Sequence, residues 1–195
     1  MGVIIDIVSS FVVRAIIITI ILNMMITLHD ALHRNTQRAV LAETIASSCS
    51  VISNDVNLAG YGNPKYQTFD IGLQTQMRFR ADLDNNGVTD IVTYRRSDMT
   101  GTSPRRYYIK RDVTSASGTT TLEIARNVVS FSIIYYSSNG AAFSYTPGSI
   151  IGVKSLVIKV TMESNTSTIG AYNTTSDNQL LQSSWQEHIF PKNLQ

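Results

Sequence analysis

Three groups of residues in this sequence have types and spacings that can do chemistry, and the first is a histidine pair. The segment HDALH places His29 and His33 four residues apart, on one face of a helix, with Asp30 beside the first. Zinc proteases use this spacing in H-E-x-x-H, where the glutamate is the general base. The one other histidine is His188, and no third ligand follows at a characteristic spacing. We therefore favour a polar collar on a helix, with Asp30 and Arg34 paired at i,i+4, over a zinc site.

The second group, DLDNNGVTD, matches part of a calcium-binding loop. Asp82, Asp84, Asn86 and Asp90 stand at positions 1, 3, 5 and 9 of the EF-hand pattern, with Gly87 at position 6. Position 12 is a threonine instead of the bidentate glutamate. Acids beside a turn are also favoured by turn chemistry alone, so a plain hairpin is the alternative. Calcium is therefore the one cofactor that the sequence suggests, and if these residues form a plain hairpin instead, no cofactor is expected.

The third group is a pair of charges, Asp6 and Arg14, in the apolar stretch IIDIVSSFVVRAIIITIIL. Each charge costs about 2.5–3.5 kcal/mol at the centre of a bilayer. Asp6, Ser10 and Arg14 are spaced at i, i+4 and i+8, so they form one polar stripe on a helix. In a bundle of similar helices each charge can find a partner on a neighbour. The alternative is that Asp6 lies at the headgroup level and that Arg14 snorkels toward water.

Composition argues against several classes of function. The 195 residues carry 16 Lys and Arg against 14 Asp and Glu, without a dense basic stripe, so nucleic acid is not an expected partner. A single cysteine, Cys49, excludes an intrachain disulfide and a thiolate zinc site. The sequence contains neither a nucleophile elbow nor a phosphate loop. We expect a protein that is not an enzyme.

The candidate residues in the first part of the chain lie on one long predicted helix. From Ala15 to Ala59 the chain has neither proline nor glycine, the residues that punctuate helices. A helix from Ile4 to Ala59 is roughly 80 Å long at about 1.5 Å per residue. Its first half is apolar nearly all round and has about the length that a bilayer requires. Its second half carries an apolar stripe, formed by Leu41, Ile45, Cys49, Ile52 and Val56, which needs a body to pack on.

Beyond Pro64 the apolar period becomes that of strands. Met77, Phe79, Ala81 and Leu83 alternate with polar residues. The Asn-Gly pair that follows predicts a hairpin, with Val88, Val92 and Tyr94 on the return strand. Further strands are expected near 106–111, 128–136, 153–162 and 185–189, with turns at SASG, SSNG and TPGS. Leu156, Ile158, Val160 and Met162 supply one apolar face.

These elements predict an α+β fold, in which a long N-terminal helix packs on an antiparallel sheet. We expect residues 1–28 to form a membrane anchor or filament core and residues 29–60 to form the amphipathic half of the same helix. Residues 61–195 would form a β-rich globular head.

Four stretches of the chain resemble a known family, in the order in which that family has them. They are NDVNLAGYG (54–62), FRADLDNNGVTDIVTYR (79–95), EIARNVVSFSIIYYSSNG (123–140) and FPKNL (190–194). The chain resembles type IV pilins and pseudopilins, in particular the W-type minor pilins of type IV pili and the J-type minor pseudopilins of type II secretion. The resemblance implies a helix that anchors the subunit in the inner membrane and then enters a filament of pilin-like subunits. The head would face the periplasm or the outside.

The family also implies a role for Asp6. In the family a basic leader ending in glycine is removed, the new N-terminus is methylated, and an acid at the fifth mature position meets a neighbour's N-terminal amine. That acid is a glutamate in the family, whereas Asp6 is fifth when counted from Gly2 and fourth when counted from Val3. Arg14 has no family counterpart, and we interpret it as a partner for an acid on a neighbour. Arg34 and Arg38 follow the span and favour a cytoplasmic head, but the four family stretches outweigh this tendency.

Two functions of different class follow from the sequence. The first is a structural or assembly subunit, a minor pilin or pseudopilin, of a type IV pilus-like filament or a type II secretion pseudopilus. The alternative is a single-span membrane protein whose β domain binds a ligand or surface without polymerising. The two differ in the use of the apolar helix, which is the core of a filament in one and a tether in the other.

Overall fold

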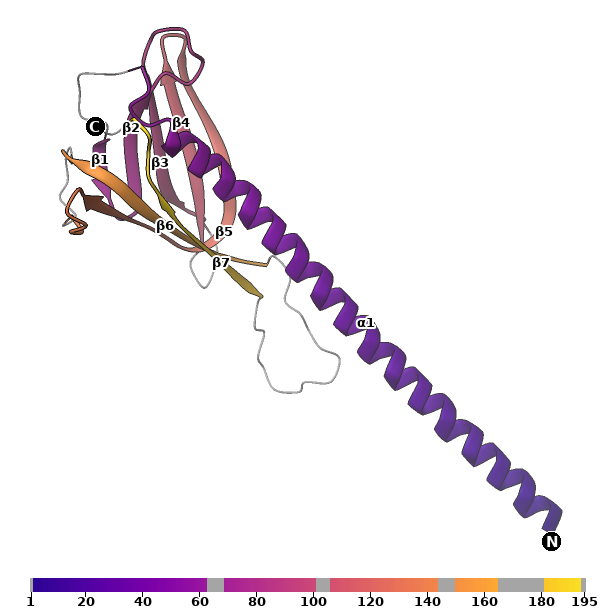
Figure 1. The fold of residues 1–195 in the computed structure, drawn as a ribbon. Coiled ribbons are helices and arrows are strands. Elements are labelled where there is room, and N and C mark those ends of the chain that lie inside the picture. The colour runs from indigo at the N-terminus through magenta and orange to yellow at the C-terminus, as the bar shows by residue number, and fades with distance from the viewer. Residues whose placement is uncertain (1, 63–68, 101–105, 144–149, 165–180, 194–195) are drawn as a thin grey trace.

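The computed structural model describes residues 2–62, 69–100, 106–143, 150–164 and 181–193. In the first turns of the helix, the side chains that it describes are that of Asp6 and those from Val8 onward. These described residues form one long helix and one antiparallel sheet of seven strands (Figure 1). The elements are α1 (Gly2–Asn57), β1 (Phe69–Leu73), β2 (Gln76–Ala81), β3 (Asp90–Asp98), β4 (Tyr107–Ser115), β5 (Gly118–Ser137), β6 (Val153–Glu163) and β7 (Gln182–Ile189). The expected α+β class is confirmed.

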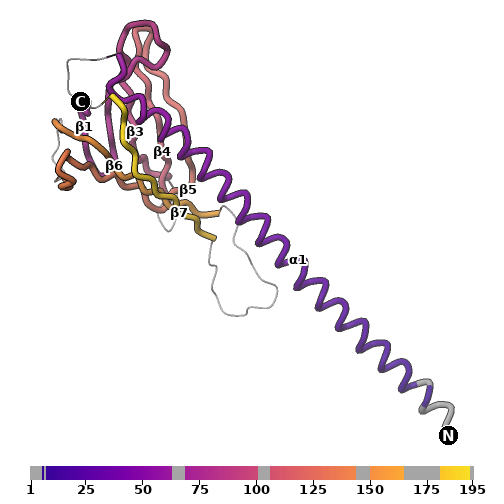
Figure 2. The backbone as a smooth tube through the Cα atoms, in the orientation of Figure 1, coloured from indigo at the N-terminus to yellow at the C-terminus, as the bar shows by residue number. Residues whose placement is uncertain are grey.

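The second half of α1 packs on the sheet and the first half projects away from it (Figures 1 and 2). All five residues of the predicted apolar stripe, from Leu41 to Val56, are buried. The helix ends two residues earlier than expected, because Leu58 and Ala59 donate to the carbonyls of Asp55 and Val56 in a tighter turn. Gly60 follows with a positive φ of 84°, a conformation that favours glycine and stops a helix.

The seven strands follow one another in chain order as a meander, and the sheet is curled because β5 bends. The first half of β5 pairs with β4 and its second half pairs with β6. Asn127 lies at the bend with a φ of 56°, and the register shifts in both pairings beside it. Asparagine tolerates this left-handed conformation better than most residues. The curl brings β1 near β5, where the Ile133 amide donates to the Gln74 carbonyl.

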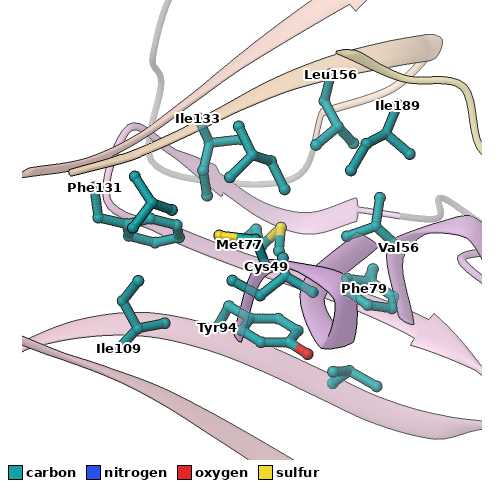
Figure 3. Packing of buried hydrophobic residues seen from close by; sticks show 14 of the residues in the cluster. Cys49, Val56, Met77, Phe79, Tyr94, Ile109, Phe131, Ile133, Leu156 and Ile189 are labelled. Carbon is teal, nitrogen blue, oxygen red and sulfur yellow. The ribbon is translucent and has the colours of Figure 1, made fainter. Parts of the chain in front are cut away.

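The core lies between the buried face of α1 and the concave side of the curled sheet. Figure 3 shows Cys49 and Val56 among side chains of β2, β3, β6 and β7, including Met77, Tyr94 and Leu156. The Cys49 thiol is fully buried, and burial raises its pKa to about 12, with a smaller contribution from the Glu187 carboxylate. The thiol lies on the predicted helix stripe, and its burial and raised pKa make it unreactive.

Three parts of the sheet differ from the sequence predictions. Val88 is not in a return strand, since residues 82–89 form a loop and β3 begins at Asp90. The strand β1 and the first half of β5 were not expected. The predicted turn at TPGS lies outside the described residues. The expected apolar face of β6, from Leu156 to Met162, is confirmed as buried.

Candidate assembly surface

The projecting half of α1 presents an apolar surface that no other part of the described chain covers. Its most apolar 18-residue window has a mean hydropathy of 2.3 and no buried residue. The large apolar side chains of this half are exposed, and the most exposed are Phe11 at 75% and Met24 at 70%. From Val8 to Leu28 the helix is about 31 Å long, close to the roughly 30 Å hydrocarbon core of a bilayer. By length and composition this helix can cross a membrane.

The two predicted charges of the span lie on this surface and are not brought together. Asp6 and Arg14 are both exposed, about 12 Å apart along the helix axis at about 1.5 Å per residue. Within the described residues, neither the Asp6 carboxylate nor the Arg14 guanidinium forms a hydrogen bond or ion pair. The Ser9 hydroxyl lies 3.4 Å from the Asp6 carbonyl, which leaves the carboxylate itself open. Both charges therefore need water, headgroups or a neighbouring chain.

Between Ala15 and Leu28 the span carries three polar residues, and the hydroxyls of two of them bond to carbonyls of the same helix. The Thr19 hydroxyl donates to the Ala15 carbonyl at 2.9 Å, and the Thr27 hydroxyl donates to the Asn23 carbonyl at 2.9 Å. The carboxamide of Asn23 has no partner among the described residues. Between Ala15 and Leu28, Asn23 is therefore the one described side chain with unused hydrogen-bond donors and acceptors.

A partly buried ion pair joins the end of α1 to the sheet. The Asp55 Oδ2 atom lies 2.5 Å from the Arg111 Nε atom and accepts a hydrogen bond from the Tyr94 hydroxyl at 2.6 Å. Burial, and next the negative charge of Asp55, raise the pKa of Tyr94 above its ordinary value. We call these three residues the clasp. Sequence reasoning missed it, although an acid in the last turn of a helix is an unfavourable placement that signals a partner.

The predicted calcium loop is held by its own side chains. Asp82 is buried, and its two carboxylate oxygens accept hydrogen bonds from the Asn86 and Gly87 amides at 3.1 and 2.9 Å. Asp84 accepts from the Asn86 amide at 3.3 Å, and Asp90 accepts from the Leu83 amide at 3.3 Å. Among the residues that the structure describes, no three His, Cys, Asp or Glu side chains converge as a metal site. Calcium binding stays a prediction, which a rise in melting temperature on adding millimolar calcium would test.

The histidine pair lies on the exposed part of α1, beyond the apolar span. His29 and His33 are exposed, and the His33 Nε2 atom lies 2.9 Å from the Gln37 amide nitrogen. The third histidine, His188, lies on β7 within 2.9 Å of the Ser155 hydroxyl. Among the described residues, no further histidine, cysteine or carboxylate completes a zinc site at this pair. The expected pair between Asp30 and Arg34 is not formed in this part of the chain.

A cavity of about 460 Å³ lies where α1 leaves the sheet. The helix contributes Val40 and Leu41 to its wall, and the strands contribute Ile124 and Met162. Two carboxylates also line it, those of Glu123 and Glu163, and each is paired with an arginine. The cavity is therefore mainly apolar, with its charges already compensated.

The comparison with solved structures gives a similar fold. A type IV-like pilin from Thermus thermophilus matches with a TM-score of 0.53 and 11% sequence identity, over 80% of this chain and 98% of that one. No protein-family model and no curated protein matches the sequence. At this identity the likeness concerns the fold alone. A long N-terminal helix on a curled antiparallel sheet is the architecture that the chain shares with this type IV-like pilin.

Proposed function

We propose that the chain is a structural subunit of a type IV pilus-like filament or of a type II secretion pseudopilus, of the minor pilin or minor pseudopilin kind. The observation that carries the proposal is the projecting apolar half of α1, which no described residue covers and whose two charges have no partner among the described residues. The shared pilin-like fold supports it. The role is structural, and the partners are other pilin-like subunits that contact this helix.

The two charges favour a helical bundle over a simple tether. A lone bilayer helix gains nothing from Asp6 and Arg14, since each is costly in hydrocarbon. In a bundle the Asp6 carboxylate can meet the N-terminal amine of a neighbour, and Arg14 can meet a neighbour's acid. The subunit would wait in the inner membrane with its head in the periplasm and then move into an extracellular filament. Leader removal and N-terminal methylation would precede that step.

The alternative function uses the cavity beside α1. A single-span protein that binds a ligand without polymerising would need a site in its head, and the cavity of about 460 Å³ near Leu41 has a size suited to a small apolar molecule. This alternative leaves the charges of the span unexplained. It predicts a membrane protein that is absent from sheared surface filaments.

The two functions are separated by one substitution and its conservative control. Asp6→Ala should leave membrane insertion intact, because it makes the span more apolar, yet strongly reduce the amount of chain in sheared surface fractions. Asp6→Glu keeps the charge and should be tolerated. Immunogold imaging of the sheared material shows whether the chain lies along filaments. Normal incorporation of Asp6→Ala would contradict the role proposed for this carboxylate, and a chain that never leaves the membrane fraction would favour the alternative.

A further inference from the structure

Asn23 is a polar side chain in the apolar span, and its carboxamide forms no hydrogen bond with any residue that the structure describes. This carboxamide carries two donors and an acceptor that are free to bond to another chain. The neighbouring hydroxyls of Thr19 and Thr27 are both taken by carbonyls of α1 itself. An unsatisfied amide in hydrocarbon costs several kcal/mol, so a partner from outside the helix is strongly favoured.

Asn23 lies on a different face of the helix from the charged stripe. Arg14 precedes it by nine residues, which is two and a half turns at about 3.6 residues per turn. The two side chains therefore point to opposite sides of α1. Ile16, Ile20 and Ile26 share the side of Asn23 and are exposed. A contact through this side leaves the stripe of Asp6 and Arg14 free for another neighbour.

We propose that Asn23 pairs with Asn23 of a second copy of this chain while both are in the membrane. Copies of one chain insert in one orientation, so Asn23 meets Asn23 at the same depth. A carboxamide both donates and accepts, and it is therefore complementary to itself, whereas two Asp6 or two Arg14 side chains repel each other. The exposed isoleucines of that side pack around the pair. The inference rests on the membrane insertion that the proposed function includes, and not on polymerisation.

Cysteine cross-linking of the purified full-length chain in lipid vesicles tests this pairing. Ile20→Cys places a thiol on the side of Asn23, and Ile21→Cys places one at almost the same depth on the far side. Wild type, whose Cys49 is fully buried, gives the background. Under mild oxidation at a low ratio of protein to lipid, Ile20→Cys should form dimers several times faster than Ile21→Cys. Equal rates at the two positions would overturn the proposal.

The role of the amide is tested by substitution in the Ile20→Cys chain. Asn23→Leu should weaken association by about threefold to thirtyfold, the range measured for hydrogen bonds between membrane helices. Asn23→Gln keeps the donors and acceptor and should retain the dimer, and Thr27→Val should change nothing because that hydroxyl is bonded within its own helix. An unchanged dimer in Asn23→Leu would overturn the proposal. Asp6→Ala should leave this cross-link intact, so a failure of the filament hypothesis is seen separately.

Discussion

Replacing Asp55 by alanine tests whether the clasp holds α1 to the sheet. Asp55 lies in the last turn of the helix, where the helix dipole disfavours a negative charge. It is compensated there by Arg111 at 2.5 Å and by the Tyr94 hydroxyl at 2.6 Å. We expect Asp55→Ala to lower the free energy of unfolding of the head by about 3 kcal/mol, because Arg111 and Tyr94 lose the acceptor that they share.

The magnitude follows from three contributions. Losing a hydrogen bond to a charged group costs about 1.5–3 kcal/mol, and leaving the buried Tyr94 hydroxyl unpaired costs about 1–3 kcal/mol. Removing the acid from the helix end regains about 0.3–1 kcal/mol. The Arg111 side chain is 21% exposed, so water restores part of its solvation. The loss expected for Asp55→Ala therefore lies at the lower end of the roughly 3–5 kcal/mol that proteins lose when one partner of a fully buried ion pair is removed.

Equilibrium unfolding in urea measures this loss, followed by the fluorescence of Trp185, the one tryptophan, which packs against the core on β7. Asp112→Ala is the matched control. Asp112 also pairs with an arginine Nε, that of Arg95 at 2.7 Å, but side chains alternate along β4 and place this pair on the opposite face. We expect the control to lose less than about 1 kcal/mol. Equal losses in the two variants would refute the reasoning.

Three other predictions concern the head. A Cβ added at Gly62 would lie 2.7 Å from the β2–β3 loop, whereas nothing lies within 4 Å at Gly87, and both have positive φ. In urea unfolding, Gly62→Ala should thus lower the free energy of unfolding by about 3 kcal/mol and Gly87→Ala should lower it by about 1 kcal/mol. Because the pKa of Cys49 is raised from 9.0 to about 12 in the folded state, its stabilising contribution is complete below pH 9. The free energy of unfolding should fall by up to about 1.4 kcal/mol per pH unit above pH 9. Melting curves recorded across this pH range should show a smaller fall for Cys49→Ala than for the wild type. Deleting residues through Leu28 should leave a soluble folded head by circular dichroism, while deleting through residue 56 should expose the sheet and cause aggregation.

The parts of the fold that the sequence predicted are those set by local patterns. The long helix and its buried stripe follow from the spacing of Leu41 to Val56 and from a run without proline or glycine. The face of β6 follows from strict alternation. Each pattern lies within a single element, so it can be recognised in the sequence without knowing what packs against that element.

The parts that were missed depend on residues far apart in the chain. Tyr94 and Arg111 reach Asp55 across 39 and 56 positions, and no local pattern pairs them. The strand β1 is short and contains Gly72, whose place in the sheet depends on close contact with Ile150. The continuity of β5 depends on a left-handed Asn127, a conformation that composition does not reveal.

The continuous helix links the candidate assembly surface to the head. Between Ala15 and Ala59 there is no proline or glycine at which α1 could hinge. The clasp at Asp55 and the buried stripe fix the far end of the helix to the sheet. Asp6 lies about 70 Å from that clasp along the axis, at about 1.5 Å per residue. If the chain assembles as proposed, a subunit that rises out of the bilayer must carry its head along the helix axis, and the packing of the apolar spans sets where each head lies on the filament.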